Sequence, residues 1–207
     1  MGRLRFGATD MALTIERTNT DVLSEHVEGV RTALQHVDIE DVGRLVDHIM
    51  EAHAAERHVY IIGNGGSAST ATHFACDLGK ATIVEGRARL RVTSLTDNVA
   101  FLTAWANDTS YERVFAEQLL SLLDPGDVVI AVSASGTSPN ILAAVEVAKR
   151  VGAVTLALVG FSGGRLLNVV NAAVHIPVSD YGVVEDCHLV LQHAITDSVR
   201  TRLLEQC

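Results

Sequence analysis

The sequence is poor in lysine, and its charge balance is acidic. Among 207 residues there are only two lysines, Lys80 and Lys149, and the formal net charge is −9. A nucleic-acid groove needs clustered Lys and Arg to neutralise phosphates, so this composition argues against a nucleic-acid partner. The one basic run, Arg87, Arg89 and Arg91, alternates in the way that is typical of a solvated sheet edge or a subunit contact.

Cysteines and long apolar runs are also scarce. Three cysteines without CxxC spacing suit a reducing cytoplasm better than a disulfide framework, so no disulfide is expected. The longest apolar runs, such as residues 128–132, are far shorter than a membrane span, and residues 1–10 lack the apolar core of a signal peptide. We therefore expect a cytoplasmic protein with no membrane association.

Apolar residues nevertheless make up 48% of the chain, which is enough for a full core in one domain. Residues 1–19 are expected to form a flexible tail, in which Met11 is a second candidate for the natural start. Residues 20–207 are expected to form a single domain. It begins with two amphipathic helices, from Asp21 to about His36 and from Ile39 to about Glu56, because apolar residues recur there at helical spacing.

Five short β-branched runs follow, at residues 58–62, 90–95, 128–133, 154–159 and 173–178, and helical stretches separate them. This alternation predicts an α/β fold with three layers, in which helices flank a five-stranded parallel sheet and the N-terminal helices are an addition. Pro139 suits the first turn of a helix that Gly152 ends, and a last helix is expected from about Val184 to Leu204.

Two loops rich in small residues follow the first and third predicted strands. The first reads Gly63-Asn64-Gly65-Gly66-Ser67, and the second, residues 133–139, reads SASGTSP. In an open parallel sheet, ligands bind beyond the carboxyl ends of the strands, and each loop leads into a helix whose N–H groups can face an anion. Either loop alone is equally well an ordinary tight turn, but two loops in equivalent positions favour a phosphate site.

A dinucleotide site is a rival interpretation of the first loop. Gly63, Gly65 and Ala68 satisfy the G-x-G-x-x-G/A pattern, and Glu85 lies about where a ribose-binding acid is expected. This pattern is weak on its own, and it leaves the serine loop unexplained. No G-K-[ST] follows the glycines, so a P-loop is excluded, and no nucleotide cofactor is expected.

Polar residues also interrupt two of the predicted helices. His73 and Asp77 are four residues apart and share one helix face, which suits metal binding or proton transfer. The last helix carries Glu185, His188 and His193. A single helical histidine is more often a hydrogen-bonded structural residue than a ligand.

Taken in order, these motifs resemble the sugar isomerase (SIS) domain family, and most closely the phosphoheptose isomerases. The resemblance covers GNGGS followed by HFA, TDN and AND at 96–98 and 106–108, SASGTSPN, GFSGG at 160–164, and VEDCHLVLQH in the last helix. It implies a flavodoxin-like sheet and a sugar-phosphate substrate. It also implies a homotetramer in which the N-terminal helices pack between subunits and the active sites lie at the interfaces.

The resemblance also assigns residues. The substrate or its phosphate is expected at Asn64, Gly65, Gly66, Ser67, Asn107, Asp108, Ser133, Ala134, Ser135, Ser138 and Glu185. Asp77 and His193 are the expected catalytic residues, and His73, Asp77, Glu185 and His193 are the expected ligands of one zinc ion per subunit. The implied reaction converts sedoheptulose 7-phosphate to D-glycero-D-manno-heptose 7-phosphate through an enediol.

Three positions depart from the family pattern: Asp77 replaces a common Glu, Glu185 a common Gln, and Ala134 a usual hydroxyl residue. Two carboxylates and two neutral imidazoles would neutralise a divalent ion, which favours metal binding. Without a metal, neighbouring carboxylates would push their pKa values apart and leave one of them as an acid. A second hypothesis is a non-enzymatic SIS tetramer that binds a replication initiator protein or senses a phosphosugar, and a third keeps the isomerase chemistry with another sugar.

Overall fold

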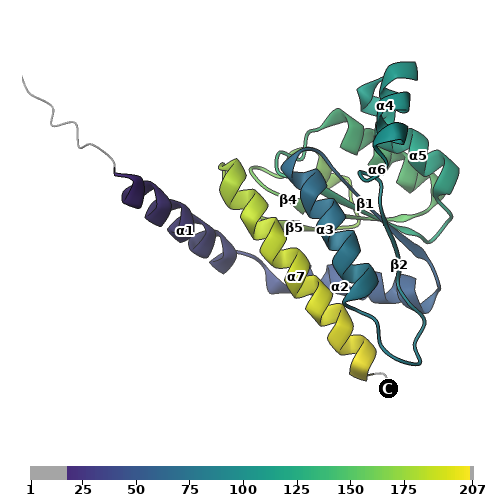
Figure 1. The fold of residues 1–207 in the computed structure, drawn as a ribbon, viewed down its shortest axis with the longest axis horizontal. Helices are drawn as coiled ribbons and strands as arrows, with labels where there is room; N and C mark the ends of the chain where they lie inside the picture. The colour runs from purple at the N-terminus through teal and green to yellow at the C-terminus, as the bar shows by residue number, and fades with distance from the viewer. Residues whose placement is uncertain (1–17, 206–207) are drawn as a thin grey trace, which may run out of the picture.

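The computed structural model describes residues 18–205, which form a three-layer α/β domain (Figure 1). Its parallel strands form one sheet in the order β2-β1-β3-β4-β5. The strands are β1 (His58–Gly63), β2 (Arg91–Ser94), β3 (Val128–Ser133), β4 (Val154–Val159) and β5 (Ala172–His175). Each overlaps a predicted run, and the strand order is that of a flavodoxin-like sheet, so the predicted fold class is confirmed.

The central strands are buried on both faces. Every residue of β3 is buried, and so are all residues of β1 and β4 except the first. Because successive side chains of a strand point to opposite faces, Ile61 and Ile130 pack into one core while Ile62 and Val129 pack into the other. Continuous Val, Ile and Leu runs are what such a doubly covered sheet requires.

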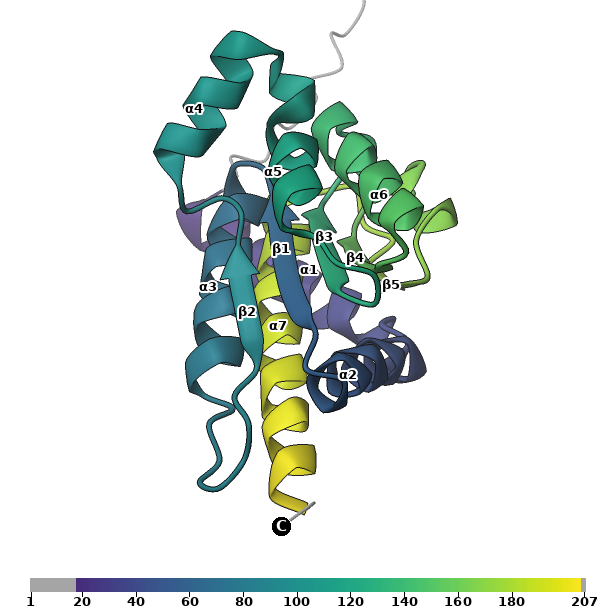
Figure 2. The same ribbon diagram turned by 90° about the vertical axis from the view of Figure 1, so that its right-hand side faces the viewer.

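Helices cover the two faces of the sheet (Figures 1 and 2). One face carries α2 (Ile39–Ala54), α3 (Gly66–Lys80) and α7 (Tyr181–Glu205), and the other carries α5 (Val114–Leu122) and α6 (Pro139–Val151). Phe74 and Leu78 of α3 fill the first core, and Phe115 and Leu119 of α5 fill the second. A further helix, α4 (Val99–Asp108), is followed by a short 3-10 turn at Tyr111–Arg113, and neither buries a residue within the described chain.

Both N-terminal helices are confirmed, and the first begins earlier than expected. The helix α1 spans Asn19–Gln35, because the Thr18 hydroxyl accepts a hydrogen bond from the Asp21 N–H while the Asp21 carboxylate accepts one from the Thr18 N–H. This reciprocal cap fixes the helix start. The predicted flexible tail over residues 1–19 lies outside the described residues, apart from Thr18 and Asn19.

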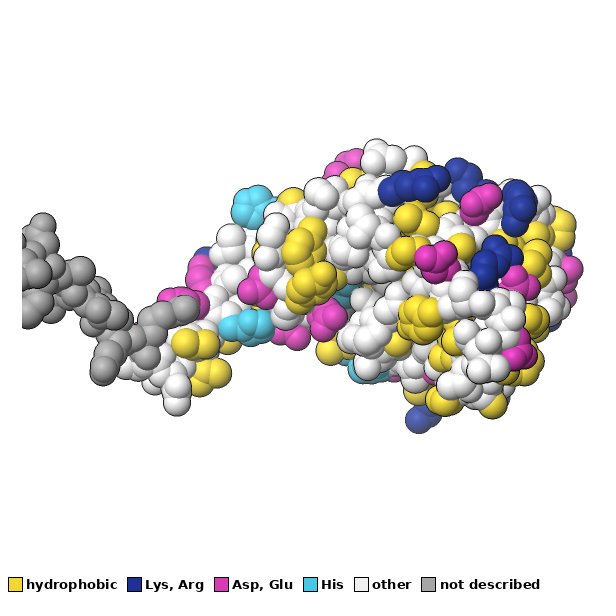
Figure 3. Space-filling model, turned by 90° about the horizontal axis from the view of Figure 1, so that it is seen from above, with side chains coloured by type: hydrophobic (Ala, Val, Ile, Leu, Met, Phe, Trp, Pro, Cys, Tyr) yellow, Lys and Arg dark blue, Asp and Glu magenta, His cyan; other side chains and the backbone are white. Residues whose placement is uncertain are grey.

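The helix α1 projects from the body of the domain (Figure 1). It packs against α7, where Gly29 lies close to Val183 and the His26 ring bonds the Asp186 carboxylate at 2.7 Å. Hydrophobic side chains lie exposed along this arm (Figure 3). They belong to Val22, Leu23 and Val27.

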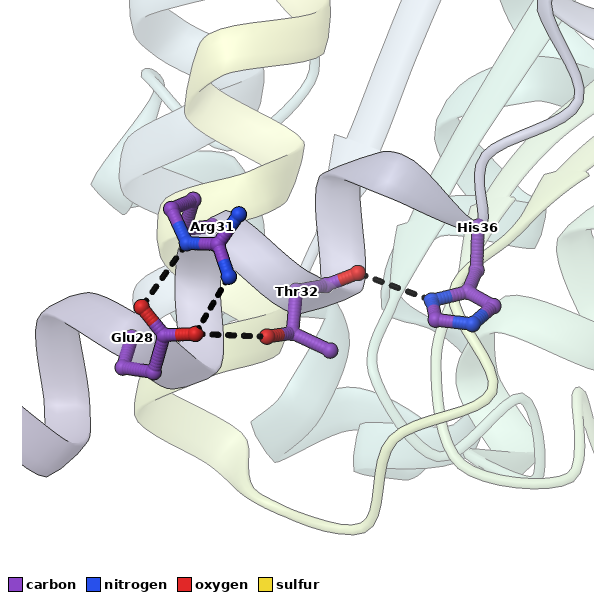
Figure 4. Close-up of polar contacts among 4 residues, drawn as sticks. All are labelled: Glu28, Arg31, Thr32 and His36. Carbon is purple, nitrogen blue, oxygen red and sulfur yellow. Dashed lines mark hydrogen bonds and ion pairs between the residues drawn. The ribbon is translucent and has the colours of Figure 1, made fainter.

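The last turns of α1 are tied by polar contacts (Figure 4). The Glu28 carboxylate accepts hydrogen bonds from the Arg31 guanidinium at 2.7 and 2.5 Å, and the His36 ring donates to the Thr32 carbonyl at 2.8 Å. This side of α1 and residues 177–178 line a mainly apolar cavity of about 450 Å³. The contacts therefore order the helix beside an apolar groove.

Several element ends differ from the sequence prediction for local reasons. The strand β5 ends at His175, well before residue 178, because Pro177 has no N–H for a sheet. The helix α7 begins at Tyr181, and the Asp180 side chain accepts a hydrogen bond from the Val183 N–H in its first turn. Pro139 starts α6, and Gly152 ends it with a φ of 91°, as predicted.

The arginine run leads into an edge of the sheet. The strand β2 lies at that edge, and the exposed Arg91 donates to the carbonyl of Glu56 at 3.1 Å. Within residues 18–205, none of the helices combines the length and apolar character that crossing a bilayer requires.

Candidate active site

The two small-residue loops meet at the carboxyl ends of β1 and β3, which are neighbours in the sheet. Between them lies a cavity of about 140 Å³. It is lined by Asn64, Ser67, Val132, Ser133, Ala134, Ser135, Ser138, Tyr181 and Glu185. Seven of the predicted substrate residues are thus brought together: Asn64, Ser67, Ser133, Ala134, Ser135, Ser138 and Glu185.

Two helices begin at this cavity. Within the described residues, neither Gly65 before α3 nor Ser138 before α6 caps its helix through a side chain. Gly65 has a φ of 54° and a ψ of −123°, a conformation that only glycine adopts readily. The N-terminus of α3 therefore presents free N–H groups and a partial positive charge, which suit an anion. At α6, Pro139 has no N–H and the Ile141 N–H bonds the Asn140 side-chain oxygen, so this helix contributes mainly its partial positive charge.

The serine loop adds hydroxyl donors. The Ser133 hydroxyl oxygen accepts from the Gly136 N–H at 3.2 Å, and the Ser135 oxygen accepts from the Thr137 N–H at 3.4 Å. Each bond uses a lone pair and leaves the hydroxyl proton for another acceptor. Gly136 is required here, because a Cβ at this residue would lie 2.0 Å from the Gly163 carbonyl oxygen. The GFSGG turn therefore holds the serine loop in place.

An asparagine pair joins the two loops. The Asn64 amide donates to the Asn140 side-chain oxygen at 2.9 Å, and the Asn140 amide donates back to the Asn64 oxygen at 2.8 Å. The Tyr111 hydroxyl also donates to the Asn64 oxygen, at 3.0 Å. Asn140, Tyr111 and Tyr181 escaped the sequence prediction. Asn140 had a signal, because it follows directly on the serine loop in the motif SPN.

A second polar group lies further along α3. The Asp77 Oδ2 atom is 3.2 Å from His73 Nε2 and 3.4 Å from His193 Nε2, and the two imidazole nitrogens are 3.3 Å apart. The rings meet edge to face, with centroids 4.9 Å apart. His73 and Asp77 come from α3 and His193 from α7, so the packing of these helices assembles the group.

This group fits a zinc ion. Donor atoms about 2.0–2.1 Å from a tetrahedral zinc lie about 3.3 Å from one another. The separations of 3.2, 3.3 and 3.4 Å among the donors of His73, Asp77 and His193 match one face of such a tetrahedron. Two imidazole nitrogens and one carboxylate are also a usual zinc donor set.

Glu185 lies apart from this group. It lines the cavity, where a Cβ on Gly66 would be only 2.2 Å from its Oε2 atom. Its carboxylate therefore faces the N-terminus of α3. Among the described residues, the group of possible metal ligands contains His73, Asp77 and His193. A fourth ligand at Glu185 stays a prediction.

Two other predicted residues lie outside the cavity. Asn107 and Asp108 end α4, where both are exposed and the Asn107 amide donates to the Asp108 carboxylate at 2.8 Å. The rival nucleotide interpretation is also weakened. Glu85 precedes β2, whereas a ribose-binding acid sits at the carboxyl end of that strand.

Behind the site, α7 buries an ionisable ring. His188 is fully buried, and burial lowers the pKa of its imidazole to about 4, with the Val159 backbone partly opposing the shift. Neither ring nitrogen has a hydrogen bond of normal geometry to residues 18–205. The ring is therefore neutral near pH 7.

A larger cavity of about 640 Å³ runs along the outer side of α6. Both aliphatic and charged side chains line it, and the charged ones are Glu146, Lys149, Arg150 and Arg165. None of the predicted site residues lines it, whereas seven of them line the smaller cavity.

Comparison with known proteins identifies the family of the chain. The SIS domain matches residues 24–160, which is most of the chain, so the protein belongs to the SIS domain family. Within it, the chain belongs with the phosphoheptose isomerases. A probable phosphoheptose isomerase of Thermoplasma acidophilum is 36% identical over 168 residues, 81% of this chain and 91% of that protein. The phosphoheptose isomerase of Mycobacterium bovis is 34% identical over 90% of this chain and 95% of its own length.

Solved structures show the same relationship. A phosphoheptose isomerase from Francisella tularensis superposes with a TM-score of 0.84 at 26% identity, over 89% of this chain and all of that one. One from Neisseria gonorrhoeae has a TM-score of 0.80 at 25% identity, over 88% of this chain and 96% of that one.

Proposed function

We infer that the protein is a phosphoheptose isomerase that converts sedoheptulose 7-phosphate, a ketose, to D-glycero-D-manno-heptose 7-phosphate, an aldose. One observation carries this inference beyond the names of the relatives. The cavity for an anion and the group at Asp77 are both built on α3, one at its N-terminus and the other in its later turns. An isomerase of a sugar phosphate needs groups that bind the phosphate at one end of the substrate and groups that move protons at the other end.

The spacing along α3 suits a long substrate. From Gly66 to His73 the helix rises about 10 Å, at about 1.5 Å per residue. An open chain of seven carbons and a phosphoester also spans about 10 Å, because each C–C bond of about 1.5 Å advances it by about 1.25 Å. A seven-carbon chain with its phosphate in the cavity thus reaches the histidines with its first carbons.

In this mechanism the serine loop and the N-termini of α3 and α6 bind the phosphate, and this remote binding energy orients the reacting carbons. Asp77 moves the proton between C1 and C2 through an enediol. His193 serves the sugar oxygens as the acid. Zinc held by His73, Asp77 and His193, with Glu185 as the predicted fourth ligand, would bind one donor atom of each side chain and would supply Lewis-acid polarisation of the carbonyl. Proton transfer would then use the second carboxylate oxygen of Asp77 and the second ring nitrogen of His193.

We also propose that the protein is a homotetramer with shared active sites. The exposed apolar side chains of α1 support contact with another copy. Asn107 and Asp108 lie outside the cavity of their own chain, so a role in substrate binding needs a neighbouring subunit. The cytoplasmic location rests on cysteine usage and stays a prediction.

A non-enzymatic SIS tetramer that binds a replication initiator protein or senses a phosphosugar would share the phosphate cavity. Such a protein has no use for His73, Asp77 and His193 on two helices with their donor atoms within 4.8 Å of one another. This group favours the isomerase.

The test is an assay of purified protein with sedoheptulose 7-phosphate, followed for the aldose product, after elemental analysis for zinc. About one zinc per chain and turnover are expected. Asp77→Asn and His193→Ala should each lower kcat by about 10²-fold or more, the contribution typical of a positioned acid or base. His48→Ala, at an α2 histidine that bonds Glu51, is the control and should keep full activity.

Absence of turnover at every zinc loading would overturn the isomerase assignment. Preferred turnover of a different ketose phosphate would keep the chemistry and change the sugar. Recovery of an initiator protein in a pull-down, together with absent turnover, would establish the non-enzymatic alternative.

A further inference from the structure

Three buried polar side chains form a stripe on α7. His188, Gln192 and Thr196 follow one another at four-residue intervals, and each is at most 3% exposed. Residues at this spacing share one helix face. The other buried positions nearby, such as Leu191 and Ile195, are apolar. A polar stripe inside a helix core therefore needs an explanation.

Thr196 is explained locally, because its hydroxyl donates to the backbone carbonyl of Gln192 at 2.8 Å. Gln192 is different. Its side-chain Nε2 donates to Asp77 Oδ2 at 3.3 Å, and its Oε1 has no hydrogen-bond partner among residues 18–205. Burying an unpaired amide oxygen costs free energy that an apolar side chain of similar size would avoid. The contribution of the Gln192 amide is the hydrogen bond that it donates to Asp77.

The Gln192 amide bonds the same Asp77 oxygen that faces the two histidines. Oδ2 of Asp77 is the atom that faces both His73 Nε2, at 3.2 Å, and His193 Nε2, at 3.4 Å. Gln192 neighbours His193 in sequence, yet it reaches Asp77 from the buried side while the histidines lie on the exposed side. The Gln192 side chain, whose own position is fixed by burial, thus holds the Asp77 carboxylate on the side away from solvent.

We propose that Gln192 is the positioning residue of Asp77: its buried amide fixes the carboxylate so that Oδ2 faces His73 and His193. The proposal rests on the proposed function and deepens it. A carboxylate that ligates a metal or moves a proton acts only from a defined direction, and partners behind such ligands commonly contribute 10-fold to 100-fold to metal affinity or activity. Gln192 is such a partner, although it lies outside the substrate cavity.

The test compares Gln192→Met with Gln118→Met. Gln118 is the matched control, because it is also buried, at 3% exposed, and its amide donates to the carbonyls of Leu95 and Val114 at 3.3 and 2.9 Å. Both variants remove a buried amide and keep the side-chain length. Gln192→Glu is a third variant, which replaces the donor with a second carboxylate beside Asp77.

Two readouts use the zinc-loaded protein. Gln192→Met should lower zinc affinity, measured by chelator competition, by about 10-fold to 100-fold, and lower kcat by a similar factor with KM for the phosphosugar unchanged. Gln192→Glu should disturb the group further, because its carboxylate repels Asp77. Gln118→Met should lower the melting temperature and leave zinc affinity and kcat as in the unaltered protein.

A third readout needs neither zinc nor turnover. In the metal-free protein, the side-chain ¹⁵N resonances of His73 and His193 should shift in Gln192→Met and stay in place in Gln118→Met. Unchanged resonances in a folded Gln192→Met protein, with zinc affinity within twofold, would overturn the proposal. If the unaltered protein turns over no phosphosugar, the proposed function fails, and the ring resonances still decide the role of Gln192.

Discussion

Asn64 and Asn140 donate a hydrogen bond to each other, at 2.9 and 2.8 Å, and so join the loop after β1 to the loop after β3. Asn140 is 2% exposed, and its side-chain oxygen also accepts from the Ile141 N–H at the start of α6. The pair therefore sets the distance between the two helix N-termini that face the cavity. The proposed phosphate binding depends on this distance, because the donors of both loops must reach the same anion.

Asn140→Leu should weaken substrate binding. Leu keeps the approximate size and removes both amide bonds, so the two loops lose their connection and the Asn64 amide loses its partner in Asn140. We expect KM for the phosphosugar to rise about tenfold, and the free energy of unfolding to fall by about 1–3 kcal/mol. Steady-state kinetics and urea unfolding measure the two effects.

The control for this variant is Asn171→Leu. The Asn171 side-chain oxygen accepts hydrogen bonds from the N–H and the hydroxyl of Thr155, both at 2.8 Å. This contact lies at the amino ends of β4 and β5, whereas the cavity lies at the carboxyl ends of β1 and β3. Its loss should reduce stability to a similar degree and leave KM unchanged. An equal rise of KM in both variants would show that general destabilisation, and not the loop connection, weakens binding.

Glu185→Gln should strengthen the binding of phosphate. The Glu185 carboxylate lines the cavity and faces the N-terminus of α3, so it repels an anion placed there. Gln keeps the shape and removes the charge. Two charges about 6 Å apart at an effective dielectric constant of about 40 interact by about 1.4 kcal/mol, which is about tenfold in affinity. Titration with inorganic phosphate, followed by ³¹P resonance, measures this change.

The same variant separates the two roles that the sequence suggests for Glu185. As a cavity residue, it should leave zinc affinity nearly unchanged when it becomes Gln. A large loss of zinc affinity with unaltered phosphate binding would contradict the cavity role and identify Glu185 as a metal ligand.

The strands and the two loops were predictable from the sequence because their signals are local. Continuous apolar runs such as VVIAVS indicate a strand buried on both faces, and β3 is buried throughout. By contrast, the run VAFLTAWAND of α4 is apolar and yet buries no residue within the described chain, and Phe101 is 49% exposed. A sequence pattern shows that a side chain is apolar, but it does not show whether the residues that bury it belong to the same chain or to another one.

The contacts that complete the site were not predictable, because they join distant parts of the chain. Asn64 and Asn140 are 76 residues apart, and Asp77 and Gln192 are 115 apart. Gln192 in particular looks like an ordinary polar residue of a helix until α7 packs on α3. Its neighbour His193 was predicted only through the family resemblance.

Stability should fall at acidic pH because of His188. Burial lowers the pKa of this ring to about 4 in the folded protein, from its usual 6.5. Below about pH 6.5 the His188 ring binds a proton in the unfolded chain but not in the folded protein. The free energy of unfolding therefore falls until about pH 4 and then levels off. By about pH 5 the loss from this one group should be about 2 kcal/mol.

The measurement is urea unfolding at about pH 7.5 and about pH 5 for the unaltered protein and for His188→Met. Other groups also titrate in this range, so the difference between the two proteins isolates His188. The variant should lose less stability between the two pH values. Equal losses would show that the folded protein protonates the ring as easily as the unfolded chain does.

Disruption of the apolar face of α1 should separate the subunits. Leu23 and Val27 are both 67% exposed and lie four residues apart, so they share one face of a helix that projects from the domain. Asp at both positions places two charges in the proposed contact, where burial of an unpaired carboxylate is strongly unfavourable. Light scattering should detect a tetramer for the unaltered protein and a smaller species for Leu23→Asp/Val27→Asp.

Leu120→Asp, at a leucine of α5 that is 53% exposed, is the control for surface charge and should stay tetrameric. Because the proposed active sites are shared, the smaller species should lose activity while its far-UV circular dichroism stays that of a folded protein. A double variant that remains tetrameric, or a smaller species that keeps full activity, would exclude the proposed arrangement of subunits around α1.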